Sequence, residues 1–443
     1  MRTTRSLLAL SVALIAPTAL ADTVEASSTT YVSAGKQTRG GLPGQSPDLV
    51  NVMPVVEVVS VSARGIRNPV FENLDVVVST WGAFDLQDRR WDAGTSGNLT
   101  GDVLTGYVRG QLFSNRLSLR LGRENVAIGA GRVASIDGGD VTLRLPLGIG
   151  LTAYAGAPVA QRFSTRDAAR SWNAMGGDFA YGGRASLAVP VPLPFLRLVE
   201  LGGSAAFVDD NGDAVRRDAG VDARVRLVGD FALNGYALWA LEDERLAEIN
   251  ALLGGHPVRD WFVSVDFRRT APDLMLSRTS ILSVFADSTR DEVGGSIRWE
   301  LLRSLGLGLD YHALLEPGDD GTGTSLGHDL VVRGDYRDGP INAGAEVDVL
   351  KGADNGYLGA RFFVRREMGK LFAAADVLAY AFDHAINAQD YAANVGATLG
   401  YKLGGAWTAS LTGRGGITPF MEQSVDVMAK LAYNQTYRVR EVR

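Results

Sequence analysis

The chain has 443 residues, a net charge of -6 and no cysteine, and its mean hydropathy is +0.03. The lack of cysteine excludes disulfides and thiolate metal sites, and the acidic balance excludes the basic footprint of a nucleic-acid-binding protein. No segment after the N-terminus has about eighteen consecutive apolar residues, which excludes membrane-spanning helices, but a hydropathy near zero is compatible with a barrel whose strands alternate apolar and polar residues.

Residues 1–21 have the pattern of a secretory signal peptide. Arg2 and Arg5 precede an apolar run from Leu7 to Ile15, and the sequence Ala-Leu-Ala ending at Ala21 is a small-residue cleavage site. The apolar run is too short for the alternative, a transmembrane anchor. We therefore expect residues 22–443 to form a single exported domain.

Alternating segments begin soon after this cleavage site. Ser27–Gly35 is a candidate first strand, and Pro54–Ala63 is the next. Within the second segment, Glu57 and Ser60 fall on opposite parities, which implies a β-bulge. Asn73–Trp81 then alternates between apolar and polar residues.

A polar loop, Leu86–Asn98, leads into a predicted hairpin. Its strands, Thr100–Leu112 and Arg116–Gly122, flank Ser114 and Asn115, a pair typical of tight turns. The next predicted strands are Asp140–Leu145, Ile149–Ala157, Phe179–Val189, Arg197–Val208, Val221–Leu227 and Phe231–Leu241, with Pro158–Met175 as an external loop.

Two segments in the middle of the chain are ambiguous. In Leu241–Leu253 the apolar residues, among them Leu246 and Ile249, fit both a helical and a strand period, so this segment is either a short helix at a barrel end or a strand. Thr270–Arg290 is unusually apolar for a loop. It either folds into the lumen or adds a strand at Ile281–Phe285.

The C-terminal half has the clearest alternation. It predicts strands at Trp261–Arg268, Glu292–Leu301, Leu305–Leu314, Asp329–Arg337, Ile341–Leu350, Leu358–Arg366, Leu371–Phe382, Tyr391–Leu403, Trp407–Gly415 and Ser424–Val439. Short turns alternate with longer polar loops, which is typical of an all-β transmembrane antiparallel β-barrel with short periplasmic turns and longer extracellular loops. With both termini in the periplasm the strand number is even, and we expect roughly 18 to 22 strands, with the last strand pairing with the first.

Aromatic residues fall toward the ends of the predicted strands. Those at the ends joined by short turns are Trp261, Trp299, Tyr336, Tyr401, Trp407 and Tyr437, and those toward the opposite ends are Trp239, Tyr357, Tyr380 and Tyr391. Tryptophan and tyrosine concentrate at both membrane–water interfaces, so this pattern predicts two aromatic girdles.

Charged residues fall on the parity opposite to the apolar ones. The predicted lumen-lining residues are Arg120, Arg144, Arg224, Arg226, Arg268, Arg298, Arg333, Arg337, Glu346, Asp348, Arg361, Arg365, Asp426 and Lys430. One arginine facing lipid at the bilayer midplane costs about 2 to 4 kcal/mol. A set of this size therefore has to line an interior.

Six of these charges lie on three consecutive predicted strands: Arg333 and Arg337 on the first, Glu346 and Asp348 on the second, and Arg361 and Arg365 on the third. Cations and anions on neighbouring strands are therefore expected to pair. Two interpretations follow. The charges form either a pore wall whose transverse field selects small charged or polar solutes, or an ion-pair ladder that fills the lumen.

The expected width of the barrel constrains its interior. Roughly twenty strands, about 4.8 Å apart and tilted by about 40 degrees, enclose a barrel about 40 Å across. Because so wide an opening would leak, in-folded loops, long arginine side chains or an oval cross-section have to narrow it. The candidate loops are Pro158–Met175 and Thr270–Arg290.

The stretch Leu119–Leu145, LRLGRENVAIGAGRVASIDGGDVTLRL, resembles a strand, loop and return strand of large Gram-negative outer-membrane channels of the porin and alginate-export type. The matching residues are Leu121, Gly122, Arg123, Glu124, Asp137 and Gly138. The resemblance implies passive passage of small polar or anionic solutes, with outer-membrane lipids and the barrel-assembly machinery as partners. Such barrels often end on an aromatic residue that this machinery recognises, whereas this chain ends on Arg443. Either Tyr437 serves as the signal instead, or the last residues are a short periplasmic extension.

The histidines and one acidic stretch are the candidates for catalysis or metal binding. His312 and His328 lie near one predicted rim, with Ser325, Asp310 and Asp329 close in sequence, but no GxSxG elbow accompanies them. The acidic stretch AFVDDNGDAVRRD lacks the glutamate of an EF-hand. We therefore predict no enzyme activity, metal site or cofactor.

The prediction from sequence is an outer-membrane channel. Two alternatives remain open: a non-conducting structural or assembly barrel, and a soluble exported all-β protein.

Overall fold

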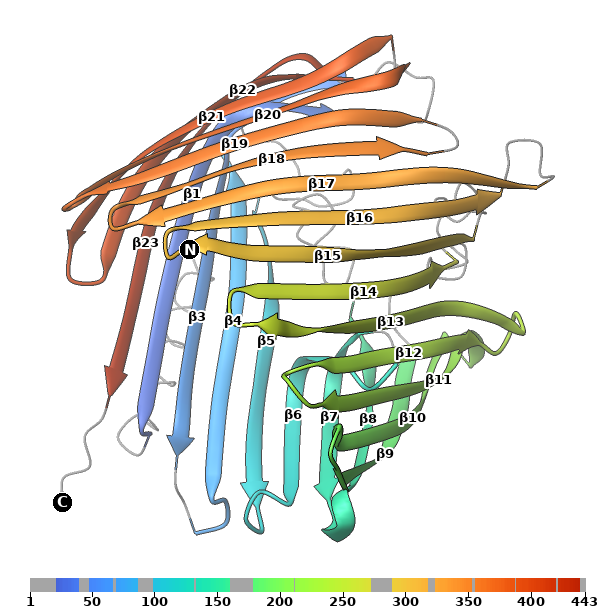
Figure 1. Cartoon of the computed structure of the whole chain (residues 1–443). Coiled ribbons are helices and arrows are strands. Elements are labelled where there is room, and N and C mark those ends of the chain that lie inside the picture. Colours follow the sequence, from blue (N-terminus) through green and yellow to red (C-terminus); the bar gives the residue numbers. More distant parts are fainter. Residues whose placement is uncertain are drawn as a thin grey trace.

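The computed structural model describes residues 21–39, 48–66, 69–86, 99–130, 133–159, 178–210, 212–271, 289–317, 323–352, 355–386, 388–419 and 421–438. Antiparallel strands in these ranges curve into a barrel (Figure 1). The predicted signal peptide, except for Ala21, lies outside the described residues. So do the predicted loops Leu86–Asn98, Pro158–Met175 and Thr270–Arg290, except at their ends, and the C-terminal residues 439–443.

The strands in chain order are β1 (Thr23–Arg39), β2 (Asp48–Val52), β3 (Pro54–Ile66), β4 (Asn73–Asp85), β5 (Leu99–Leu112), β6 (Leu117–Val126), β7 (Ala134–Arg144), β8 (Ile149–Pro158), β9 (Phe179–Leu193), β10 (Leu196–Asp210), β11 (Asp213–Leu227), β12 (Ala232–Ala240), β13 (Arg245–Val258), β14 (Trp261–Thr270), β15 (Arg290–Leu302), β16 (Leu305–Pro317), β17 (Thr324–Asp338), β18 (Ile341–Lys351), β19 (Gly356–Met368), β20 (Leu371–Ile386), β21 (Gln389–Gly404), β22 (Trp407–Thr418) and β23 (Met421–Arg438). A 3-10 turn, Pro146–Gly148, joins β7 to β8. In the part of the chain that the structure describes, no helix is long and apolar enough to cross a membrane.

The first strand closes the barrel. One edge of β1 pairs with β23, from Thr23 opposite Arg438 to Ala34 opposite Val427, and its other edge pairs with β3. The short strand β2 extends β3, because its pairing with β1 continues the same register after Met53. The 23 strands therefore fill 22 places around the barrel, 23 minus one. The predicted barrel, the predicted range of strand numbers and the pairing of the last strand with the first are confirmed.

The ambiguous segment Leu241–Leu253 is largely a strand. It contributes to β13, in which Leu246 is opposite Trp239 and Ile249 is opposite both Ala237 and Arg269. Pairing on both edges satisfies the backbone N–H and C=O groups inside a barrel wall. This pairing outweighs the helical spacing of the leucines.

The predicted β-bulge between Glu57 and Ser60 is wrong. Registers with both neighbouring strands are uninterrupted from Val55 to Ala63. Without a bulge, Glu57 and Ser60 point to opposite faces of the sheet.

Several strands extend beyond their predicted ends. β9 continues to Leu193 despite two prolines, and β20 continues to Ile386. The neighbouring strands offer hydrogen-bond partners to these polar or proline-containing ends, which alternation alone does not reveal. The predicted hairpin turn is confirmed, with Phe113, Ser114 and Asn115 at φ values of 55°, 55° and 64°.

The two faces of the wall differ in polarity. Ile297, Leu309, Val332 and Val347 are direct partners on β15 to β18, and each is between 42 and 47% exposed. We call the face that carries this row the apolar face. Side chains one position away, such as Arg333 and Glu346, point to the opposite side, which we call the polar face.

The two ends of the barrel also differ. The end that carries Thr23 and Arg438 has two-residue turns at 194–195, 259–260, 303–304, 339–340, 369–370 and 405–406. We call it the short-turn end. The opposite end carries the longest connections, residues 86–98, 159–178 and 271–289, but also the two-residue connections 211–212, 387–388 and 419–420. The predicted alternation of short turns and long loops is therefore only partly present.

Candidate functional site: the polar face and an in-folded segment

Four predicted lumen residues lie in one row on the polar face. Arg298 on β15 is opposite Gly308 on β16, and Gly308 is opposite Arg333 on β17. Glu346 and then Arg361 continue the row on β18 and β19. The row therefore places three guanidinium groups and one carboxylate on neighbouring strands.

The ion pairs in this region differ from the predicted ones. Arg333 binds Asp310, Arg361 Nη2 lies 2.9 Å from an oxygen of Asp376, and Arg365 binds Glu367 at 3.0 Å. Among the described residues Glu346 has no ion-pair partner, so the predicted pairing of Arg333, Glu346 and Arg361 is wrong. The register places Arg333 beside Glu346 on β18. The long side chain of Arg333 reaches instead to Asp310 on β16, the strand on the other side of β17.

A glycine leaves room for the ion pair of Arg333 with Asp310. A Cβ added to Gly308 would lie 2.8 Å from Cγ of Arg333. The side chain of Arg333 therefore occupies the space over Gly308 and reaches Asp310 two residues along β16.

The remaining predicted lumen residues have varied partners. Arg268 lies 3.6 Å from Glu292, Arg144 donates to the carbonyl oxygen of Asn115 at 2.8 Å, Asp348 accepts from the hydroxyl of Tyr357 at 2.8 Å, and Lys430 Nζ lies 5.3 Å from the ring centroid of Tyr31. Arg120 Nη2 lies 2.6 Å from Asp140, and Asp426 is opposite Arg414. Arg224, Arg226, Arg298 and Arg337 have no acid within ion-pair distance in the described ranges.

The residues predicted for the first girdle lie near the short-turn end. Trp261 and Trp299 are cross-strand partners whose rings stack at 5.1 Å, and the Trp407 ring lies 4.9 Å from that of Tyr433. The hydroxyl groups of Tyr433 and Tyr437 are 2.9 Å apart. Two more members, Tyr336 and Tyr401, are exposed near the ends of β17 and β21.

Two residues predicted for the second girdle belong instead to the polar face. Tyr357 donates to Asp348, and its ring meets that of Tyr380 edge-on at 5.2 Å. The prediction considered only that Tyr357 and Tyr380 lie near strand ends. Their parity along the strands puts both side chains on the face that carries the charges.

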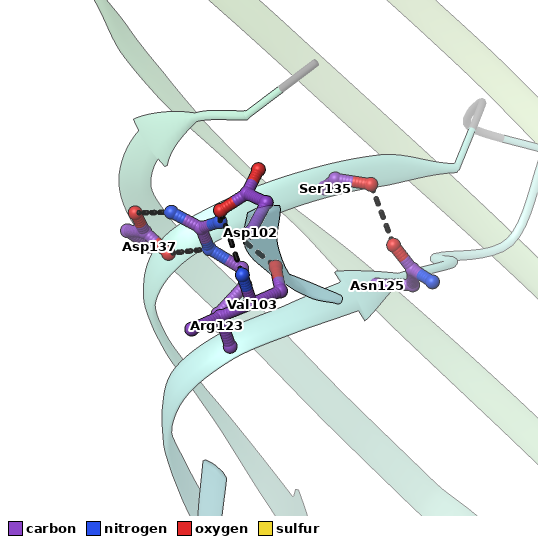
Figure 2. A network of polar contacts seen from close by, with 6 residues as sticks. All are labelled: Asp102, Val103, Arg123, Asn125, Ser135 and Asp137. Atoms are coloured by element: carbon purple, nitrogen blue, oxygen red, sulfur yellow. Dashed lines mark hydrogen bonds and ion pairs between the residues drawn. The ribbon is translucent and has the colours of Figure 1, made fainter. Parts of the chain in front are cut away.

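A buried arginine joins three strands on the other side of the barrel. Arg123 on β6 is 6% exposed and donates through Nε and Nη2 to both oxygens of Asp137 on β7, at 2.6 and 2.7 Å (Figure 2). Its Nη1 donates to Asp102 Oδ1 at 2.7 Å and to the carbonyl oxygen of Val103 at 2.9 Å, both on β5. The resemblance named Arg123 and Asp137, but nothing in the sequence indicated Asp102.

The chain that follows this arginine folds over the polar face. Ile128 and Ala130, in the connection between β6 and β7, are 7% and 5% exposed. Ile128 packs in a buried cluster with Val126, Ile136, Tyr154 and Ala180. We call residues 127–130 the in-folded segment.

The contacts of the in-folded segment reach as far as β11. A Cβ added to Gly220 on β11 would lie 2.6 Å from Cβ of Ala130, and one added to Gly129 would lie 2.6 Å from Asp222 Oδ2 and 2.9 Å from Arg184 Cδ. The segment therefore lies directly on the polar side chains of β9 and β11. The two loops predicted to fold inward, Pro158–Met175 and Thr270–Arg290, lie mostly outside the described residues. The in-folded segment was not among the predictions.

Arg184 and Asp222 form the surface on which the segment rests. Arg184 Nε and Nη2 lie 3.0 and 2.5 Å from the carboxylate of Asp222, and Nη2 lies 3.0 Å from Glu200. A Cβ added to Gly202, on the intervening strand β10, would lie 2.6 Å from both Arg184 and Asp222. The ion pair of Arg184 and Asp222 thus occupies the space over Gly202.

The in-folded segment and the arginine row lie on different parts of the barrel wall. From β11, on which the segment rests, to β17 there are 17 minus 11, or six, of the 22 steps around the barrel. The strand that carries Arg333 is therefore about a quarter of the way round the barrel from the segment.

His312 and His328 point to opposite faces of the wall. His312 Nε2 lies 3.1 Å from Asp266 Oδ2 on the polar face, whereas Nδ1 of His328 lies 2.8 Å from the hydroxyl of Tyr311, an exposed residue on the apolar face. The two histidines thus lie on neighbouring strands, as predicted, but their side chains do not meet. No serine joins either histidine among the described contacts.

No protein-family model and no curated protein matches the chain. Among solved structures, the chain is similar to the translocation pore of the P pilus usher PapC, with a TM-score of 0.48, 9% identity and coverage of 93% of this chain and 100% of that chain. It is also similar to OccAB4 of Acinetobacter baumannii, with a TM-score of 0.43, 7% identity and coverage of 95% and 100%. For OccK5 (OpdH) of Pseudomonas aeruginosa the TM-score is 0.43, the identity 10% and the coverage 94% and 99%.

The architecture fits a bilayer. The closed sheet leaves no unpaired edge at β1 or β23, and its apolar face carries exposed valine, leucine and isoleucine on consecutive strands. Closure and an apolar surface are what a bilayer requires of a β protein. The fold is that of a large outer-membrane β-barrel.

Proposed function

We propose that the protein is an outer-membrane channel for the passive passage of small polar or anionic solutes. The polar face lines the lumen and the apolar face contacts lipid. The observation that carries this proposal is the charged row from Arg298 to Arg361 on a wall whose opposite face is apolar.

The preference for anions rests on the arginines that lack acidic partners. Within the described residues, Arg224, Arg226, Arg298 and Arg337 face no carboxylate within ion-pair distance, so their charge is available to a solute. The paired arginines, such as Arg361, add less because Asp376 offsets their charge.

The width of the lumen is limited by the in-folded segment. A barrel of this strand number is roughly 40 Å across between strand axes. Side chains of both walls and the segment on β8 to β11 reduce the open section on one side.

Ion selectivity tests the lining. In planar bilayers under a salt gradient, we expect the reversal potential of the wild-type channel to indicate anion preference. Arg298→Glu with Arg337→Glu should shift the permeability ratio toward cations, because two unpaired positive charges become negative. The change Arg361→Glu with Arg365→Glu should act in the same direction.

The control is Lys370→Glu, which makes the same kind of change in a turn at the short-turn end. We expect it to have a smaller effect on the ratio than the paired reversals. An unchanged ratio in both double variants would contradict the assignment of these residues to the lumen.

A non-conducting structural barrel is the second candidate. It is favoured by the many polar-face ion pairs, such as Arg184 with Asp222, which fill space as well as carry charge. A folded barrel that inserts into a bilayer and never conducts would support this candidate over the channel.

A further inference from the structure

One carboxylate lies on the wrong face for a lumen residue. Glu57 on β3 is opposite Thr30 on β1, and Thr30 is opposite Leu431 on β23, which is 39% exposed on the apolar face. Val59, two residues along β3, is 37% exposed. Direct partners share a face, so Glu57 points toward lipid.

Two hydroxyl groups hold this carboxylate in place. Ser28 Oγ donates to Oε1 of Glu57 at 2.5 Å, and Thr30 Oγ1 donates to Oε2. A carboxylate has about four acceptor positions. Each oxygen thus keeps a free lone pair that points away from β1.

No described residue neutralises the charge of Glu57. Across the described ranges no lysine, arginine or histidine lies within ion-pair distance of it. An ionised group that faces the membrane is costly, and such groups usually have a partner. The partner of Glu57 therefore has to come from the surroundings of the barrel.

Aromatic residues show the depth of Glu57 in the membrane. Ser28 is opposite Tyr433, whose ring lies 4.9 Å from that of Trp407 and whose hydroxyl lies 2.9 Å from that of Tyr437. Tryptophan and tyrosine in this arrangement mark the level of the lipid headgroups. The short turns and both strand termini put this level on the periplasmic side.

We infer that Glu57, with Ser28 and Thr30, binds the ammonium headgroup of a phospholipid in the periplasmic leaflet. A primary ammonium supplies both the missing positive charge and N–H donors for the free lone pairs. The ring of Tyr433 offers a second contact to a cation at the same level. The inference depends on the placement of the barrel in a membrane and not on whether it conducts.

A lipid fits this site better than a second protein chain. A stable protein interface buries about 800 Å² on each partner, whereas the one feature that calls for a partner here is the single charge of Glu57. Here the flanking residues Val59, Val427 and Leu431 remain exposed and apolar like the rest of the belt. One counter-charge at headgroup level is what the site lacks.

Lipid retention tests the inference. The purified full-length barrel would be titrated with phosphatidylethanolamine and with phosphatidylglycerol of the same acyl chains, and bound lipid counted by native mass spectrometry. We expect about tenfold tighter binding of the ethanolamine lipid, because its ammonium offers Glu57 an opposite charge whereas phosphatidylglycerol brings only a negative one. In Glu57→Gln this preference should disappear, because the amide keeps the shape and loses the charge.

The matched control is Glu25→Gln, on the neighbouring strand, whose side chain contacts Ser62 and Arg64. It should leave the lipid preference unchanged. Phosphatidylcholine, which carries the charge without N–H donors, should bind more weakly than the ethanolamine lipid, and phosphoethanolamine without acyl chains should not compete at equal concentration.

Equal retention of both lipids by the wild type would overturn the inference. So would a wild-type barrel that is a dimer and becomes a monomer in Glu57→Gln, which would indicate a protein interface instead. If Glu57→Gln fails to fold, as judged by heat-modifiable gel mobility, Ser28→Ala with Thr30→Ala provides the second test. That variant keeps the charge but frees the carboxylate, and an unchanged preference there would also contradict the site. None of these outcomes affects the selectivity test of the channel.

Discussion

At the scale of single residues, glycines decide which charges meet on the polar face. Arg184 crosses Gly202 to reach Asp222, Arg333 covers Gly308, and a Cβ on Gly294 would lie 2.4 Å from Cδ2 of His312. Each glycine leaves the space through which a long side chain passes. The partners of these charges therefore depend on which neighbouring position lacks a side chain.

Adjacent glycines on β10 provide a direct test. Valine at position 202 would meet Arg184 and Asp222, whereas Gly203, which points to the other face, has nothing within 4 Å of an added Cβ. We expect Gly202→Val to lower the free energy of unfolding by about 1 to 3 kcal/mol, the usual cost of overpacking. Gly203→Val should change it little, and urea unfolding followed by tryptophan fluorescence measures both. Equal changes in the free energy of unfolding for the two variants would show that the pair of Arg184 and Asp222 does not need the space over Gly202.

Sequence predicts the face of a residue better than its contacts. Alternation placed Arg333, Glu346 and Arg361 on neighbouring strands, and the register confirms that they are partners. It did not indicate that Arg333 turns to Asp310, because side-chain direction along a strand is not encoded in parity. For Glu57 the predicted face was wrong. Its polar side chain on the apolar parity suggested a β-bulge, but the register shows none and Glu57 stays on the apolar face.

At the scale of elements, the in-folded segment depends on the Arg123 network. Arg123 joins β5, β6 and β7 immediately before the chain turns over the polar face. Leaving two carboxylates without their buried cation costs about 3 to 5 kcal/mol. We expect Arg123→Ala to free the segment and raise single-channel conductance, while Asn125→Ala, which removes an exposed hydrogen bond to Ser135, should not.

Because the chain has no cysteine, the position of the segment can be locked with a disulfide. Ala130→Cys with Gly220→Cys should crosslink on oxidation, since a Cβ added to Gly220 would lie 2.6 Å from Cβ of Ala130, and a shift of about 1 Å reaches the Cβ–Cβ distance of a disulfide. Oxidation should lower the conductance of the Arg123→Ala background and leave that of the otherwise wild-type barrel unchanged. Ala130→Cys with Gly396→Cys, on β21, is the non-crosslinking control. Efficient crosslinking of the control pair would show that the segment is not held on β11.

The sequence contained a signal for this segment that the predictions did not use. Val126 ends β6 and Ile128 follows it, and both are apolar although they stand on the parity opposite to that of Leu121, where polar residues are the rule. Apolar residues in a short connection indicate packing against something. Which wall they pack against depends on the curvature of the barrel, and that is a property of the whole sheet.

At the scale of the whole molecule, closure joins strands that are far apart in sequence, as in the pairing of Thr23 with Arg438, which are 438 minus 23, or 415, positions apart. The alternation predicted a barrel with an even strand number, and the physical need to pair every edge predicted that β1 meets β23. The exact number depended on two weak segments, Ser27–Gly35 and Leu241–Leu253. Local pattern could not settle these, because their neighbours in space supply the hydrogen bonds.

A second cysteine pair tests closure. Thr29→Cys with Ala432→Cys joins direct partners on β1 and β23, whereas Thr29→Cys with Thr408→Cys spans one strand more in the same row. We expect only the first pair to crosslink. The oxidised barrel should then keep its compact gel mobility at temperatures that unfold the reduced form. Crosslinking of the second pair alone would contradict the register at the seam.

Conductance of the purified barrel tests the proposed function most directly. Purified wild-type protein, shown to be folded by its heat-modifiable mobility, would be added to a planar lipid bilayer under a constant voltage. Discrete current steps, with a reversal potential on the anion side in a salt gradient, are the predicted result. A folded barrel that inserts and produces no steps would contradict it.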